Sequence, residues 1–143
     1  MNNIKVHREQ LTLGEFIDRL ADAARHGAAD HIAFDFCGLV PTSFASSRGD
    51  YSEIALGWAD QRGSIDSLRR AREEWPEPSV ATLLDRARRA IGVRFPGWKG
   101  GGCTATQGTL LWVDNPGEWS NTTITGVELC DGVAVIRTAR VET

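Results

Sequence analysis

The sequence predicts an α+β fold, with one mostly antiparallel sheet, two helices packed on one face of it and a β-hairpin at the C-terminus. Two stretches have the apolar spacing of amphipathic helices, and several short stretches alternate apolar with polar or small residues. Asp131-Gly132 joins the last two short stretches and is typical of a tight hairpin turn. The chain has 143 residues, of which 41% are hydrophobic and 24% charged, so we expect a single domain spanning residues 1–143.

Both predicted helices have recognisable ends. Thr12 and Glu15 have the spacing of a capping box, and Gly27 is a typical terminator of the helix that follows them. Ser79 and Gly92 bound the second helix in the same way. The apolar positions expected to face the sheet are Leu13, Phe16, Ile17, Leu20 and Ala24 in the first helix, and Val80, Leu83, Leu84, Ala87 and Ile91 in the second.

The first two strands are expected at His31–Phe36 and Tyr51–Trp58, as neighbours in the sheet. Residues 37–50 contain glycine, proline and serine, which favour a long irregular loop between these strands. Residues 60–78 are highly charged and are interpreted as a variable insertion with a short helix over Ser64–Glu74. The remaining strands are expected at Thr109–Val113, Thr122–Cys130 and Val133–Val141.

Charge and composition exclude several classes of function. The net charge of −3 gives no basic field for a polynucleotide or a membrane surface, although a small anion in a local basic pocket remains compatible with it. The chain has no 18-residue apolar run and no signal peptide, so we expect it in the cytoplasm. Three cysteines without CxxC spacing and three histidines without metal spacing predict no disulfide, metal or cofactor.

No known catalytic motif is present, so the sequence predicts no catalytic residues and favours a protein that is not an enzyme. Acid–base candidates near the long loop are present, as in any chain of this length, and give only a weak indication of catalysis. They are His31, Asp35, Asp50 and Glu53.

A first candidate binding motif lies at Ser46–Tyr51. The Ser47 hydroxyl and the Arg48 guanidinium can bind phosphate, and Gly49 allows backbone N–H groups to turn towards a ligand. Tyr51 supplies a ring for stacking on a base. The alternative is an ordinary surface turn in which the arginine pairs with a neighbouring carboxylate.

A second candidate motif lies at Phe95–Gly102. Trp98 offers a ring face, Lys99 a positive charge, and Gly100 and Gly101 exposed backbone N–H groups, as in an anion-binding nest. The motif follows a helix instead of preceding one, so it is not a phosphate loop of the usual kind. The alternative is a flexible glycine linker with a solvated lysine.

These motifs and their order resemble those of a family of small proteins of bacteriophages and prophages, which carry the motifs SxRGxY and FxG(W/Y)KGG. This chain departs from the family pattern at Ser47, where an aromatic residue is expected, and at Gly102-Cys103. The resemblance implies a phage origin and a role against host defence. It rests on Ser46–Tyr51 with Ile54–Leu56, Ser79–Gly92, Phe95–Gly101 and Leu111–Val113.

Together, the two motifs and the resemblance predict a binding protein that sequesters a small phosphorylated, nucleotide-derived ligand. A host immune signal of the cyclic nucleotide or cyclic ADP-ribose type is the expected ligand, and a homo-oligomer is expected to close the site. Three alternatives stay open. These are an inhibitor that binds a host defence protein through the long loop and Trp119, an enzyme that cleaves a nucleotide messenger with Glu53 or His31 as base, and a minor virion protein.

Overall fold

The computed structural model of the protein describes residues 9–27, 31–35, 39–48, 53–60, 79–96, 102–113 and 122–141. The described helices are α1 (Leu13–Arg25) and α3 (Val80–Ala90). The strands are β1 (His31–Phe34), β2 (Leu39–Arg48), β3 (Glu53–Asp60), β4 (Arg94–Pro96), β5 (Gly102–Thr104), β6 (Leu110–Val113), β7 (Thr122–Cys130) and β8 (Val133–Arg140). The charged insertion and its short helix were predicted over residues 60–78, and residues 61–78 lie outside the described part of the chain.

Six strands form one mixed sheet in the order β1-β8-β7-β6-β3-β2, and β4 and β5 form a separate two-stranded sheet. Strand β1 is parallel to β8 and β3 is parallel to β6, whereas the other pairings of the large sheet are antiparallel. Helix α3 lies in the connection between β3 and β6, and a crossover of this length allows β6 to return parallel to β3. The α+β class is therefore confirmed, and the sheet is mixed instead of purely antiparallel.

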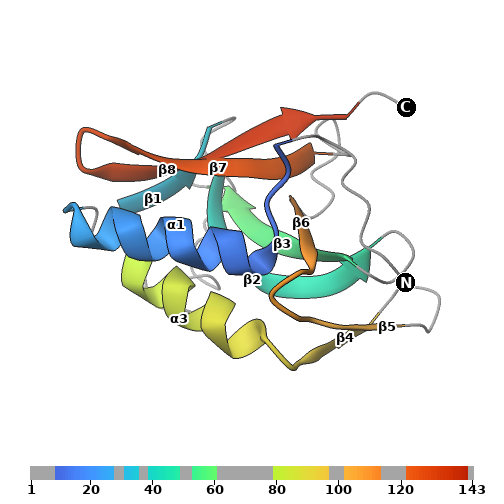
Figure 1. Cartoon of the computed structure of the whole chain (residues 1–143). Helices are drawn as coiled ribbons and strands as arrows, with labels where there is room; N and C mark the ends of the chain where they lie inside the picture. The colour runs from blue at the N-terminus through green and yellow to red at the C-terminus, as the bar shows by residue number, and fades with distance from the viewer. Residues whose placement is uncertain are drawn as a thin grey trace.

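The two helices lie side by side on one face of the large sheet (Figure 1). Helix α1 contacts β7, α3 contacts β2, and the helices contact each other. Between the layers, the rings of Phe16 and Phe44 meet edge to face, with centroids 6.4 Å apart. Burial of large apolar side chains of this kind contributes about 1.5–3 kcal/mol each, so this layer of contacts holds the helices on the sheet.

Both helices begin as the sequence predicts, and each is bounded by a glycine with positive φ, Gly27 or Gly92. The Oγ1 atom of Thr12 accepts a hydrogen bond from the Glu15 N–H at 3.2 Å, and Glu15 Oε1 accepts one from the Thr12 N–H at 3.0 Å. The predicted apolar faces are wrong at their last position. The buried residues there are Ala23 and Ala90, whereas Ala24 and Ile91 are exposed.

The prediction of a long loop over residues 37–50 is wrong, because β2 occupies most of it and pairs with β3 from Leu39↔Asp60 to Arg48↔Glu53. The pairing register shifts between Pro41 and Phe44 and again between Phe44 and Ser46. Proline lacks a backbone N–H and is tolerated on an edge strand or at a bulge. Strand β2 lies at the edge of the sheet, and its register shifts next to Pro41. The sequence predicted that β1 and β3 would be neighbours in the sheet, and this prediction is wrong.

The C-terminal hairpin is confirmed. Strands β7 and β8 pair antiparallel up to Cys130↔Val133, and Asp131 and Gly132 both have positive φ, at 50° and 80°, as a type I′ turn requires. Strand β6 lies inside the sheet beside β7, and all four of its residues are buried, including Trp112. A strand that is buried on both faces is apolar throughout, which explains its uninterrupted LLWV sequence.

Candidate functional site

The first predicted binding motif lies where β2 ends and the chain turns back into β3. Ser47 pairs with Ile54 and Arg48 with Glu53, so these two pairs close the β2–β3 hairpin. The backbone of Ser47 and Arg48 is described, and Gly49 and Tyr51 lie outside the described residues. The motif thus belongs to a hairpin end instead of the end of a long irregular loop.

The second predicted binding motif lies at the end of another hairpin. Strands β4 and β5 pair antiparallel, and Pro96↔Gly102 joins the end of β4 to the start of β5. Trp98, Lys99, Gly100 and Gly101 fall between these strands, outside the described residues. The sequence predicted the glycine motif but not the hairpin that holds it.

The β4–β5 hairpin is anchored at its other end. The side chain of Phe95 is buried in the main core. Backbone hydrogen bonds join Gly92 N–H to the Ala105 carbonyl oxygen at 2.8 Å and Ala105 N–H to the Val93 carbonyl oxygen at 2.9 Å. The base of this hairpin is therefore tied to the end of α3.

The two hairpins lie against each other, because β2 contacts both β4 and β5. In Figure 1 the end of β2, the end of β4 and the start of β5 lie on the same side of the molecule, at the right of the view. The structure therefore brings together the strands that carry the two motifs.

Asp35, one of the acid–base candidates, has a structural role. Its carboxylate accepts hydrogen bonds from the Thr138 N–H at 3.0 Å and from the Thr138 hydroxyl at 2.6 Å. These bonds tie the chain after β1 to β8. His31 and Glu53 lie on β1 and β3, which three strands separate in the order of the sheet.

Two described arginines have shifted pKa values, and both stay cationic at neutral pH. Burial lowers the pKa of Arg86, and the neighbouring Asp85 partly offsets this effect. The hydrogen bond from Arg137 to Glu128, together with their attraction, raises the pKa of Arg137. A guanidinium that does not titrate near neutrality can bind an anion but is unsuited to proton transfer.

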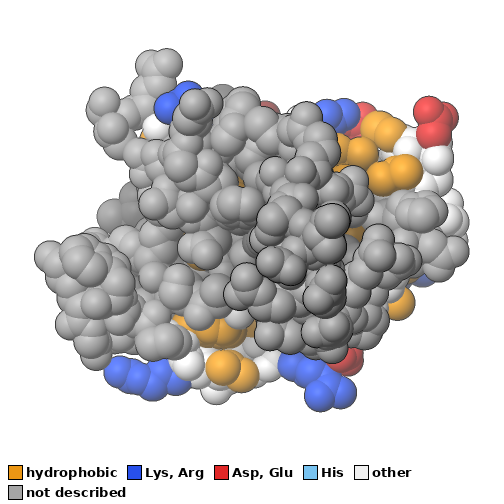
Figure 2. Space-filling view, turned by 180° about the vertical axis from the view of Figure 1, so that it is seen from behind, with side chains coloured by type: hydrophobic (Ala, Val, Ile, Leu, Met, Phe, Trp, Pro, Cys, Tyr) orange, Lys and Arg blue, Asp and Glu red, His pale blue; other side chains and the backbone are white. Residues whose placement is uncertain are grey.

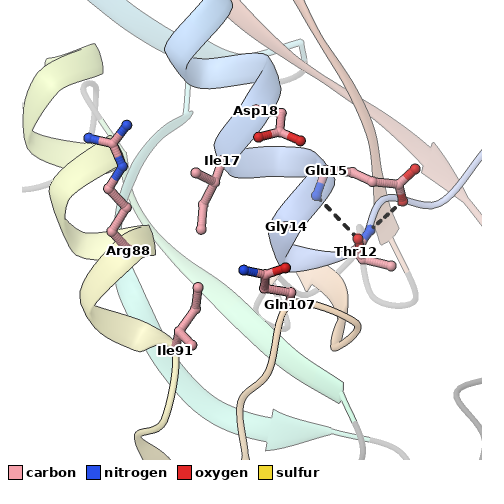
Figure 3. A pocket seen from close by; sticks show the side chains of 8 residues that line it. All are labelled: Thr12, Gly14, Glu15, Ile17, Asp18, Arg88, Ile91 and Gln107. Carbon is pink, nitrogen blue, oxygen red and sulfur yellow. Dashed lines mark hydrogen bonds between the residues drawn. The ribbon is translucent and has the colours of Figure 1, made fainter.

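A shallow groove that the sequence did not predict lies between the start of α1 and the end of α3 (Figure 3). Its volume is about 470 Å³. The first turns of α1 form one wall, Arg88 and Ile91 form the other, and Gln107 comes from the turn before β6. Because the two walls are more than sixty positions apart in the chain, no local pattern could indicate the groove.

The start of α1 does not supply this groove with free N–H groups at its first three positions. The Leu13 N–H donates to the Thr109 carbonyl oxygen at 2.7 Å, and the Gly14 N–H donates to the Gln107 carbonyl oxygen at 2.9 Å. The Glu15 N–H is bound by the capping hydroxyl. An anion site of the kind found at open helix N-termini is therefore not formed by these donors.

Within the described ranges, no three His, Cys, Asp or Glu side chains lie close enough together to hold a metal ion. Cys130 is a free, half-buried thiol in β7. Neither helix of the described part is long and apolar enough to cross a membrane. Comparison of the chain with protein-family models, with curated protein sequences and with solved structures finds no match in any of the three.

Proposed function

We propose that this chain is a non-enzymatic binding protein that sequesters a small phosphorylated, nucleotide-derived ligand at the adjoining ends of its β2–β3 and β4–β5 hairpins. The single observation that supports the proposal is the contact of β2 with β4 and β5. This contact makes neighbours of two strand pairs that each lead into a motif with a cation, a glycine and a ring. Two such motifs on adjacent hairpins provide the elements that a phosphate and a base require.

The residues divide into three roles in this proposal. Arg48 and Lys99 neutralise phosphate charge, with the guanidinium able to bind two phosphate oxygens at once. The Ser47 hydroxyl and the N–H groups of Gly49, Gly100 and Gly101 donate hydrogen bonds to the remaining oxygens. Tyr51 and Trp98 stack on the base, since aromatic stacking accepts any base.

In this proposal, which the resemblance to phage proteins supports, the chain acts in the cytoplasm of an infected host. There the ligand would be an immune signal such as a cyclic nucleotide or a cyclic ADP-ribose type molecule, and a homo-oligomer would close the site. The net charge of −3 is compatible with a small ligand held by local cations and unfavourable for a long polynucleotide.

Ligand capture tests the proposal directly. Purified protein is incubated with a panel of cyclic nucleotides and ADP-ribose derivatives, desalted and heat-denatured, and the released small molecules are identified by mass spectrometry. We expect release of one ligand class with its mass unchanged. A changed mass would instead indicate the messenger-cleaving enzyme, and absence of capture across the panel would contradict the proposal and favour a protein partner.

Variants then test the location of the site. Arg48→Ala and Lys99→Ala are each expected to weaken capture by ~10-fold or more, because each removes a charge-assisted contact to phosphate. Arg19→Ala is the matched control, since Arg19 is an exposed arginine on α1 and belongs to neither hairpin. If the first two variants bind the ligand as tightly as the control does, the ligand lies elsewhere on the molecule.

A further inference from the structure

Each wall of the groove between α1 and α3 carries an isoleucine. Figure 3 shows Ile17 from α1 and Ile91 from the end of α3 on facing sides of the groove. Ile17 packs against the core, whereas Ile91 is 39% exposed, and Val93 two residues further on is 44% exposed. Seen from behind, hydrophobic side chains also reach the surface between basic ones along the lower edge of the molecule (Figure 2).

The two walls of the groove carry opposite charges. Asp18 lies on the α1 wall and Arg88 on the α3 wall, and both side chains are exposed. Within the described part of the chain, neither forms an ion pair. By contrast, Arg89 on the next position of α3 pairs with Asp85 at 2.9 Å. The groove therefore has one unpaired charge of each sign beside exposed apolar groups.

We infer that this groove is the interface for a second copy of the chain. A ligand or peptide of one charge would complement only one of the two walls. A second copy complements both, because a twofold axis along the groove places α1 of each subunit over α3 of the other. Asp18 then faces the partner's Arg88, and the same contact forms a second time across the axis.

The direction of the helices agrees with this arrangement. Helices α1 and α3 run antiparallel, and both the start of α1 and the end of α3 lie at the groove (Figure 1). A rotation about a twofold axis parallel to the helices leaves their directions unchanged. Helix α1 of one subunit therefore lies antiparallel to α3 of the other, with opposed dipoles. The exposed face of Ile91 is covered in the same contact, which removes apolar surface from water.

The inference goes beyond the proposed ligand site, since it involves none of the residues of the two hairpin motifs. It assigns a surface to the homo-oligomer that closure of the ligand site would require. Association is measured on the ligand-free protein, so failure of the dimer and failure of ligand capture are distinguishable outcomes.

Charge reversal provides the sharpest test. Sedimentation or native mass spectrometry is expected to show that the wild-type chain is dimeric. Asp18→Arg or Arg88→Asp alone is expected to weaken self-association by ~10-fold or more, because each substitution places like charges opposite each other in both symmetric contacts. An equimolar mixture of the two variants, one carrying a mass tag, is expected to form heterodimers, since both contacts between them are again of opposite sign. A monomeric wild type, or a mixture that does not associate, would overturn the inference.

A matched pair of apolar variants tests the contribution of the isoleucine on the α3 wall. Ile91→Ser is expected to weaken dimerisation, whereas Leu129→Ser on β7 should leave it unchanged, although the two side chains are 39% and 40% exposed. Circular dichroism verifies that each variant is folded. Equal effects of the two substitutions would show that association depends on general hydrophobicity and not on this groove.

Discussion

Helices α1 and α3 start from the same local design but are attached to the rest of the molecule differently. Each has a hydroxyl residue at its N-cap, an apolar face on the core and a glycine with positive φ near its end. At the start of α1, however, two further N–H groups donate to carbonyl oxygens from the turn before β6. Among the first three N–H groups of α3, only that of Thr82 is bound within the described part of the chain, to Ser79 Oγ at 3.1 Å.

The difference shows that similar capping does not imply similar anchoring. Residues before α1 extend the attachment, with the Leu11 N–H bound to the Ile124 carbonyl oxygen at 2.8 Å and the Leu111 N–H bound to the Leu11 carbonyl oxygen at 3.2 Å. Side-chain packing holds both helices, and backbone bonds additionally join the α1 segment to the centre of the sheet. We therefore expect α1 to open together with the sheet and α3 to open more independently.

Truncation of a buried leucine in each helix has the largest expected effect. Leu20 and Leu83 are 0% and 1% exposed, and replacement of either by alanine should lower the free energy of unfolding by about 2–5 kcal/mol. In native-state hydrogen exchange, Leu83→Ala should accelerate mainly the amides of α3. Leu20→Ala should accelerate those of α1 together with β6 and β7. The same set of accelerated amides in both variants would contradict the difference in anchoring.

Removal of the N-caps has an intermediate effect and a predicted order. Ser79→Ala should lower the free energy of unfolding by about 1 kcal/mol, because its hydroxyl is the main acceptor at the start of α3. Thr12→Ala should cost less, since Glu15 still binds the N-cap N–H and the carbonyl oxygens before β6 still bind the next two donors. Urea denaturation of both variants checks the order, and a larger loss for Thr12→Ala would reverse the interpretation.

The parts of the fold that the sequence predicted are those that depend on neighbouring residues. Capping residues, terminating glycines and the Asp131-Gly132 turn each act within a few positions, and all were identified correctly. Strand β2 was missed because Pro41 and the serines that follow it are typical of loops, whereas the strand exists through its pairing with β3. The order of the sheet also depends on contacts between distant segments, which no local pattern contains.

The candidate sites follow the same division. Composition drew attention to the Arg48 and Lys99 motifs, but only the contact between their hairpins, formed by distant strands, relates one motif to the other. The groove is a stronger case. No local pattern distinguishes Arg88 or Asp18 from other charged helix residues, and only the packing of α1 beside α3 places them on opposite walls.

The smallest expected effect comes from the second position of each helix, which is Gly14 in α1 and Ala81 in α3. In an open helix, alanine is more stable than glycine by about 0.5–1 kcal/mol. Ala81 is exposed, so Ala81→Gly should cost an amount in that range. At Gly14 a Cβ atom would lie 3.1 Å from the backbone oxygen of Gln107, which closes the start of the helix.

Gly14→Ala should therefore show none of the gain that propensity alone predicts, because relief of this contact requires the turn before β6 to move away and lengthens the Gly14 N–H···Gln107 O bond of 2.9 Å. Thermal unfolding of the two variants measures the difference between a tethered and an untethered helix start at the same position. If Gly14→Ala stabilises the protein by as much as Ala81→Gly destabilises it, the turn before β6 yields freely. The backbone contacts would then explain less of the anchoring of α1 than its packed side chains do.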